Sequence, residues 1–195
     1  MNDDFFTLTD KIGVGTYSDK RSKFLAFAHH TEDEDSIKKI LDGYKKKYFD
    51  ARHVCYAYML GAERKIYRAN DDGEPSSTAG KPILGQINSR NLTNVLVVVV
   101  RYYGGVNLGT GGLIVAYRSA AALALDNAEI IKKQVEEIID FNFSYTCMNG
   151  VMRIVKEMSP RIINQTFDNT CNIKLSIRKS EAEKLRNCLN SLSFK

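Results

Sequence analysis

Residues 97–112 read Val-Val-Val-Val-Arg-Tyr-Tyr-Gly-Gly-Val-Asn-Leu-Gly-Thr-Gly-Gly. The apolar run Val95–Tyr102 predicts a strand that is covered on both faces, and the segment from Gly111 to about Asn127 predicts an alanine-rich helix. The loop between them is rich in glycine, which either lets a backbone approach an anion closely or permits positive φ angles and tight helix–strand packing. Both interpretations stay open for Gly104, Gly105, Gly109, Gly111 and Gly112.

The composition is that of an ordinary globular protein. The chain has 195 residues, 44% hydrophobic and 26% charged, which suits one large or two small domains with a buried core. The formal net charge of +5 permits an acidic partner without requiring one. The four cysteines include no Cys-x-x-Cys pair, so we expect reduced thiols and neither a zinc site nor a disulfide framework. The sequence shows no signal-peptide pattern and no apolar run of membrane-spanning length, which predicts a cytoplasmic protein.

The pattern before residue 133 predicts alternating strands and helices. One helix places Ile37, Ile40, Leu41, Tyr44 and Tyr48 on one face, and the lysines near its end suit the helix dipole. A second helix, with Thr78 as its expected N-cap, has a proline in its first turn. The expected elements are strands at 23–28, 54–61 and 65–69 and this second helix at 79–89.

The polar segment Lys132–Glu137 predicts a boundary between a domain at 1–133 and a domain at 134–195. The second domain reads as β-α-β-β-α, an order that resembles a ferredoxin-like unit without its final strand. Its expected elements are a strand at 138–146, a helix at 148–158, strands at 162–167 and 171–177 around an Asp168-Asn169-Thr170 turn, and a helix from the expected cap Ser180 to about Leu192. Only Ser193-Phe194-Lys195 remain for a last strand, which we therefore expect to be short or absent.

An acidic loop precedes the second helix. Asp71, Asp72 and Glu74 either hold a divalent cation through oxygen ligands or cap turns and helix ends. The calcium-loop pattern is absent, so we favour capping and expect no metal and no cofactor.

Two basic residues stand at predicted junctions of loop and helix or strand. Gly80-Lys81 is not a phosphate loop, because Pro75 replaces its first glycine and Pro82 its Ser or Thr. Lys81 still lies near a helix N-terminus, which favours an anion. Arg101 ends the apolar strand and either pairs with an acid of the 71–74 loop or binds a phosphate through its guanidinium.

Catalytic patterns are weak. His53 precedes Cys55 by two residues, but the sequence offers no third group to orient a nucleophilic pair, so a packed histidine is the favoured interpretation. There is no G-x-S-x-G and no G-x-G-x-x-G motif. We therefore favour a binding protein over an enzyme.

Taken together, the chain resembles the YigZ/IMPACT family (UPF0029), in its bacterial two-domain form. The motifs that carry the resemblance are Lys20-Arg21-Ser22-Lys23-Phe24, Ala51-Arg52-His53-Val54-Cys55, Asp71-Asp72-Gly73-Glu74-Pro75, Thr78-Ala79-Gly80-Lys81-Pro82, and Val99 to Gly105 with Leu108 to Leu113. Val54 departs from the many relatives that have a second histidine at this position, which weakens any paired-histidine chemistry.

The resemblance implies an α+β protein. It implies an N-terminal α/β domain like one in a small-subunit ribosomal protein and like domain four of elongation factor G, and a small ferredoxin-like C-terminal domain. Eukaryotic relatives restrain the amino-acid-starvation kinase that controls translation initiation by binding its activator. For bacterial relatives a nucleic-acid or ribosome-linked role is the usual inference; the peptidase label that some carry has no support in these residues.

Three functions remain. The leading one is a cytoplasmic protein that regulates translation by binding RNA, the ribosome or a translation-related protein, with no membrane association and no sequence-specific DNA binding. The alternatives are an enzyme for a phosphorylated or nucleotide-like small molecule, with the acidic loop on a metal, and a protein-interaction module. The expected binding surface combines Asp71, Asp72, Glu74, Thr78, Gly80, Lys81, Arg101, Tyr102, Gly104, Gly105, Gly109, Gly111 and Gly112, with His53 as a further candidate.

Overall fold

A computed structural model describes residues 3–167 and 171–193. The chain forms two compact units. One comprises Phe5–Lys133, and the other runs from Gln134 onward and includes Asp3 and Asp4. Within the described residues, no helix has both the length and the apolar character needed to span a bilayer.

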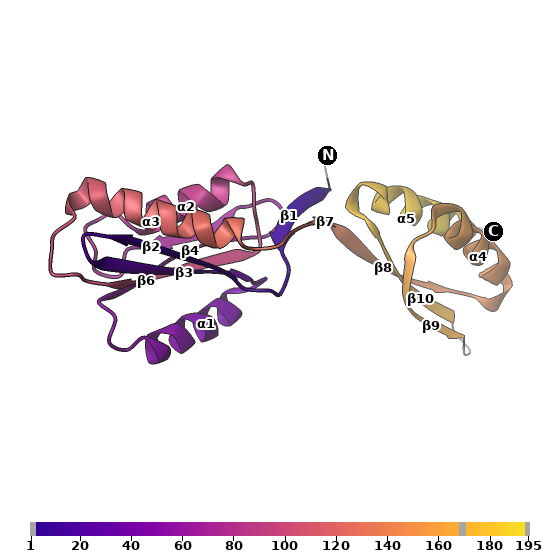
Figure 1. Ribbon diagram of the computed structural model, residues 1–195. Helices are drawn as coiled ribbons and strands as arrows, with labels where there is room; N and C mark the ends of the chain where they lie inside the picture. Colours follow the sequence, from indigo (N-terminus) through magenta and orange to yellow (C-terminus); the bar gives the residue numbers. More distant parts are fainter. Residues whose placement is uncertain (1–2, 168–170, 194–195) are drawn as a thin grey trace. The chain divides into compact units, whose positions relative to one another are not determined.

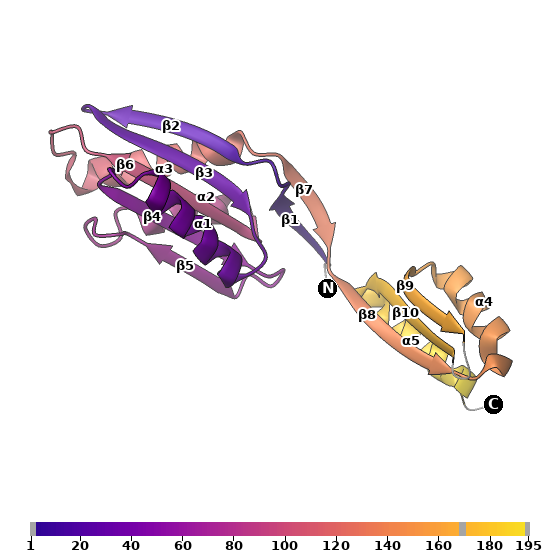
Figure 2. The same ribbon diagram turned by 90° about the horizontal axis from the view of Figure 1, so that it is seen from below.

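The first unit is built on a five-stranded antiparallel sheet of order β2-β3-β6-β4-β5. Helix α1 covers one face, and helices α2 and α3 cover the other (Figures 1 and 2). Strands β1 and β7 form a separate two-stranded sheet. The elements are β1 Asp4–Leu8, β2 Gly13–Asp19, β3 Ser22–His30, α1 Glu34–Lys47, β4 His53–Leu60, β5 Ile66–Asn70, α2 Gly80–Ser89, β6 Val95–Tyr102, α3 Gly109–Asp126 and β7 Ile130–Gln134.

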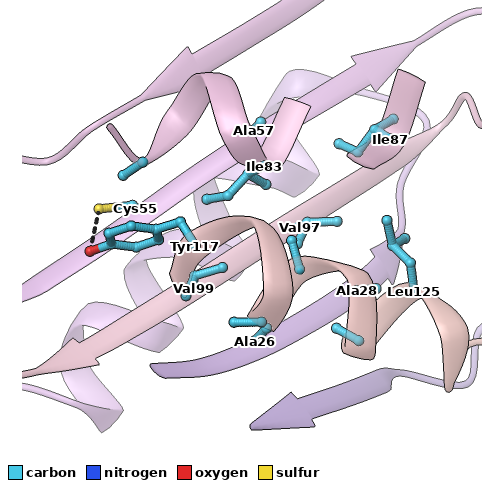
Figure 3. Close-up of a cluster of buried hydrophobic side chains, with 14 of the residues drawn as sticks. Ala26, Ala28, Cys55, Ala57, Ile83, Ile87, Val97, Val99, Tyr117 and Leu125 are labelled. Carbon is cyan, nitrogen blue, oxygen red and sulfur yellow. Dashed lines mark hydrogen bonds between the residues drawn. The ribbon is translucent and has the colours of Figure 1, made fainter. Parts of the chain in front are cut away.

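Strand β6 is the centre of this unit, as its apolar run predicts. The residues from Val95 to Val100 are fully buried, because one face of the strand packs toward α2 and α3 and the other toward α1. Tyr117 of α3 lies in the first of these layers and accepts a hydrogen bond from Cys55 of β4 (Figure 3). The sheet and its helices thereby fix the end of β6, where Arg101 follows the valines.

Helix α3 packs closely on the sheet because its inner residues are small. Ala116, Ala120, Ala121 and Ala124 are fully buried. Opposite them lies Gly15 of β2, where an added Cβ would come within 2.5 Å of the Ala124 backbone nitrogen. The close approach thus depends on alanine on one side and glycine on the other.

The second unit has a three-stranded antiparallel sheet of order β8-β10-β9. Its core contains Ile139, Ile173, Leu175, Leu185 and Leu189, and its β-α-β-β-α order agrees with the sequence prediction. The elements are β8 Glu136–Phe143, the 3₁₀ turn η1 Tyr145–Cys147, α4 Met148–Met158, β9 Arg161–Phe167, β10 Cys171–Arg178 and α5 Lys179–Ser193.

The polar segment Lys132–Glu137 holds the end of β7 and the start of β8, and the two compact units meet along the chain within it, between Lys133 and Gln134. Other local predictions differ from the structure. Ser180 does not cap α5; its backbone N–H donates to Asp3 Oδ2 at 2.8 Å. The predicted turn at 168–170 and the last two residues of the expected final strand lie outside the described residues.

Candidate functional site

A cleft of about 700 Å³ opens at one end of the five-stranded sheet of the first unit. Its walls come from five segments: the start of β4, the acidic loop, the end of β6, the glycine loop and the first turn of α3. Its lining residues are Arg52, His53, Glu74, Pro75, Arg101, Tyr103, Asn107, Leu108, Gly109, Thr110 and Leu113.

A buried ion pair forms the floor of this cleft. Arg101 Nη1 lies 2.5 Å from Glu74 Oε1, and the two side chains are 6% and 3% exposed. The rings of Phe24 and Tyr103 each lie 5.6 Å from the guanidinium carbon, close enough for cation–π contact. The Nε atom of Arg101 is buried and has no hydrogen-bond partner among the described residues.

The Tyr117 hydroxyl is a second donor to the Glu74 carboxylate. The Tyr117 hydroxyl donates to Glu74 Oε1 at 2.7 Å and accepts from Cys55 Sγ at 3.3 Å. Burial raises the pKa of the Tyr117 phenol and of the Cys55 thiol, so both groups keep their protons at neutral pH. Tyr117 therefore acts as a neutral donor, and Arg101 supplies the balancing charge.

His53 has the orienting group that the sequence did not reveal. Its Nδ1 lies 2.7 Å from the carbonyl oxygen of Asp72. Because a carbonyl oxygen only accepts hydrogen bonds, Nδ1 must carry the hydrogen of this bond. Nε2 lies 3.9 Å from Glu74 Oε2, and the side chain is 15% exposed where it lines the cleft.

The carboxylate of Asp71 occupies the N-terminus of α2. It accepts from the backbone amides of Ser77, Ala79 and Gly80 at 2.8, 3.0 and 2.8 Å. Partial burial raises the pKa of Asp71, but these three amide donors and the charge of Lys81 outweigh it and hold the pKa below its usual value. The prediction that Thr78 caps this helix is wrong, because its hydroxyl donates to the Pro75 carbonyl at 2.6 Å.

The remaining predicted residues around α2 also lie outside the cleft lining. Lys81 borders a separate hollow with Ser77 and Arg118. Gly80 packs on β5, where an added Cβ would lie 2.5 Å from the Asn70 backbone nitrogen. The structure therefore does not bring Lys81 and Arg101 into one pocket.

The carboxylates of the acidic loop accept hydrogen bonds from donors of the protein itself. Asp72 Oδ2 accepts from the Val54 backbone N–H at 2.7 Å, while Asp71 and Glu74 are engaged as described above. Across residues 3–167 and 171–193, no group of three or more His, Cys, Asp or Glu side chains is arranged to hold a metal ion.

The N-terminus of α3 is not capped by a side chain. Leu108 occupies the N-cap position without a side-chain hydrogen bond, and the first turn contains no acidic residue. Gly109, with φ +73°, and Thr110 line the cleft. The first four amides of a helix have no partner within the helix, so this end of α3 presents N–H donors and a positive partial charge to the cleft.

The other glycines of the loop shape the backbone. Gly104 lies against the hairpin between β2 and β3, where an added Cβ would lie 2.1 Å from the Arg21 carbonyl carbon. Its N–H donates to Ser22 Oγ at 3.1 Å. Gly105 has φ +82°, Gly111 faces open space, and an added Cβ on Gly112 would lie 3.1 Å from Leu108 Cβ.

Tyr102 points away from the cleft lining and donates to Asp50 Oδ1 at 2.8 Å. Sequence reasoning missed Arg52, Tyr103, Asn107 and Thr110 as lining residues. Arg52 and Tyr103 lie inside the family motifs, Ala51–Cys55 and Val99–Gly105, so membership of these motifs is the signal that could have found them. The Arg52 guanidinium is exposed and has no hydrogen-bond or ion-pair partner in the part of the chain that the structure describes.

Comparisons with known proteins agree on the family of this region. The family model of the Impact N-terminal domain matches residues 20–125. The IMPACT family member YvyE of Bacillus subtilis is 33% identical over 71% of this chain and 64% of that protein, so the match spans less than two thirds of its length. The IMPACT family member YigZ of Escherichia coli is 33% identical over 76% of this chain and 74% of that protein.

The fold is also similar to that of a solved protein. The crystal structure of a hypothetical protein aligns with 99% of this chain and 94% of its own, with a TM-score of 0.74 and 27% sequence identity. The similarity thus covers both units of the chain, whereas the family model covers the first.

Proposed function

This chain belongs to the IMPACT family, and we propose that it is a cytoplasmic binding protein that takes part in regulating translation by binding RNA or the ribosome. In the same proposal the first unit has the fold of domain four of elongation factor G and the second is ferredoxin-like. The order β8-β10-β9 with two helices supports the second assignment.

One observation carries the RNA proposal: the cleft presents the uncapped start of α3 beside two arginines. The charges of Glu74 and Arg101 cancel in their ion pair. Arg52 and the start of α3 therefore leave the cleft with an excess of positive charge. Phosphate groups are the part of RNA that such a site binds without reading its sequence.

Further basic residues stand at the same end of the sheet. Lys20 and Arg21 form the exposed two-residue turn between β2 and β3. Lys23, exposed at the start of β3, pairs in register with Tyr102 at the end of β6. The contact of Gly104 with Arg21 ties this hairpin to the glycine loop, so the hairpin lysines and arginine extend the positive surface beside the cleft.

The hairpin turn allows a test that leaves the fold intact. Lys20 and Arg21 have φ of +42° and +66°, a geometry that Asn-Gly adopts more readily than Lys-Arg. The double variant Lys20→Asn/Arg21→Gly therefore removes two charges without straining the turn. Lys45→Ala/Lys46→Ala on α1 is the matched control, since it removes two charges from the helix on the opposite face of the sheet.

The experiment measures binding of single-stranded RNA and of ribosomes across a salt series. We expect the hairpin variant to bind several-fold more weakly, with a salt slope reduced by about 1–2, and the α1 variant to match the wild type. Wild-type binding that is absent, or insensitive to salt, would contradict the proposal. Partners that survive nuclease treatment in a pull-down would indicate the protein-interaction module instead.

The enzyme alternative has one observation in its favour, the oriented ring of His53. Its Nδ1 is held by Asp72 while Nε2 lies in the wall of the cleft, which is the arrangement of a general base. Against a metal on the acidic loop stand the donors that already occupy Asp71, Asp72 and Glu74. Turnover of a phosphorylated small molecule that is lost in His53→Gln would establish this alternative.

A further inference from the structure

We propose that the cleft holds the terminal phosphate of a nucleotide, either free or at the end of an RNA strand. The inference rests on the proposed function and deepens it, because it names the chemical group that this cleft selects. Three features of the cleft support it. The Nε edge of the Arg101 guanidinium lacks a hydrogen-bond acceptor among the described residues, backbone donors surround the start of α3, and one wall of the cleft is apolar.

The guanidinium of Arg101 has donors that the protein does not use. Glu74 accepts from Nη1, while Nε is buried and has no hydrogen-bond partner among the described residues. Nε and Nη2 together form the side-on edge of a guanidinium, which suits two oxygens of one phosphate. The side chain is 6% exposed, and a buried N–H without an acceptor is unfavourable. A phosphate oxygen would supply the acceptor that is missing.

Independent donors stand on the other walls of the same cleft. The first amides of α3, at Gly109 and Thr110, have no side-chain cap. Arg52 precedes β4, and its backbone N–H donates to the carbonyl of Arg101 at 2.9 Å. This hydrogen bond fixes the Arg52 backbone beside Arg101, and the Arg52 side chain is exposed. A terminal phosphate offers three oxygens and up to two charges, so it can meet both arginines and the helix end, whereas an internal phosphodiester has two free oxygens and one charge.

The remaining wall suits the rest of a nucleotide. Tyr103 is 48% exposed, and its ring joins Pro75, Leu108 and Leu113 in the lining. An aromatic ring of this kind stacks with any base. The volume of about 700 Å³ lies in the range of pockets that bind small molecules, about 300–1,000 Å³.

A substitution at Thr110 tests the site without disturbing the fold. Thr110 is exposed in the first turn of α3, where a carboxylate interacts favourably with the helix dipole. Thr110→Asp therefore places a negative charge at the phosphate position while keeping or improving helix stability. Thr110→Asn is the matched control because it has the same shape without the charge. Arg52→Ala removes one cationic wall, and Arg68→Ala on β5 is its control outside the cleft.

Binding is measured by calorimetry with UMP, uridine and inorganic phosphate. Fluorescence anisotropy follows one short RNA in three forms: 5′-phosphorylated, 3′-phosphorylated, and with hydroxyls at both ends. We expect UMP to bind and uridine not to bind. We expect Thr110→Asp and Arg52→Ala to weaken UMP binding by about tenfold or more, Thr110→Asn to weaken it clearly less than Thr110→Asp does, and Arg68→Ala to stay within about twofold of the wild type.

The outcomes separate this inference from the proposed function. RNA that binds equally with and without a terminal phosphate contradicts the inference and leaves the proposed function in place. UMP binding without any RNA binding supports the inference for a free nucleotide and contradicts the proposed function. Equal binding of UMP and uridine, or a Thr110→Asp variant that binds UMP like the wild type, overturns the inference.

Discussion

Glu74 Oε1 lies 2.5 Å from Arg101 Nη1, and the pair is buried where the acidic loop crosses the end of β6. Removing the charge of either side chain leaves the other charge buried without a counter-charge. We therefore expect Glu74→Gln to lower the free energy of unfolding by about 3–5 kcal/mol, as measured by urea denaturation. The double variant Glu74→Gln/Arg101→Met, which removes both charges, should recover part of this loss. A Glu74→Gln protein as stable as the wild type would show that the pair contributes no such balance.

Asp71 should stabilise the start of α2. Its carboxylate accepts from three backbone amides, and we expect Asp71→Ala to lower the free energy of unfolding by about 1–2 kcal/mol. Asp71→Asn keeps an acceptor oxygen and should lose less. Equal losses in both variants would mean that the carboxylate acts through something other than these hydrogen bonds.

The same carboxylate predicts a pH dependence. The pKa of Asp71 in the folded protein lies below its usual value of 3.8. Its contribution is therefore complete above the unfolded pKa and is lost as the pH falls through the folded pKa. We expect the stability difference between wild type and Asp71→Asn to be constant near neutral pH and to shrink below about pH 4. Urea denaturation over an acid series measures it, and a difference that grows toward low pH would contradict the assignment.

Gly104 in the loop and Gly111 in the first turn of α3 should respond in opposite ways to alanine. At Gly104 an added Cβ would lie 2.1 Å from the Arg21 carbonyl carbon, so Gly104→Ala should be destabilising through a forced backbone shift. Gly111 lies in α3 and faces open space, so Gly111→Ala should add up to about 1 kcal/mol. Thermal unfolding of both variants compares them directly. Similar shifts of the same sign would contradict the distinction.

Tyr103 should distinguish a nucleotide from bare phosphate. If its ring stacks with the base, Tyr103→Leu should weaken UMP binding by about 1–3 kcal/mol and leave the affinity for inorganic phosphate nearly unchanged. Calorimetry with both ligands makes the comparison. Equal losses for UMP and phosphate would instead indicate that the ring acts by positioning Arg101, over which it lies.

The sequence predicts the centre of the first unit well and its edges poorly. The valines of β6 and the alanines of α3 carry strong patterns because burial on both faces and close packing each restrict residue type. Strand β2 escaped prediction because its inward positions Gly13 and Gly15 give no apolar signal, while its Val14 is exposed. Glycine at these positions allows close contact with α3. This is a tertiary contact, and the periodicity of the sequence carries no information about it.

The site shows the same limit. The motifs brought out Glu74, Arg101 and Gly109, all of which line the cleft. They also suggested Lys81, because α2 begins beside it, but Asp71 fills that helix end from nine residues earlier in the chain. Local sequence cannot show which of two helix ends is occupied by a distant carboxylate. For that reason α3, with no acidic residue near its start, is the end that remains available in the cleft.

An NMR titration with UMP would locate the phosphate site, because it reports each backbone amide separately. We expect the largest shifts on the amides of Gly109, Thr110 and Gly111, together with Arg52, and none of these shifts with uridine. Shifts centred on the Lys81 and Arg118 hollow, or identical shifts with uridine, would contradict a phosphate site at the start of α3.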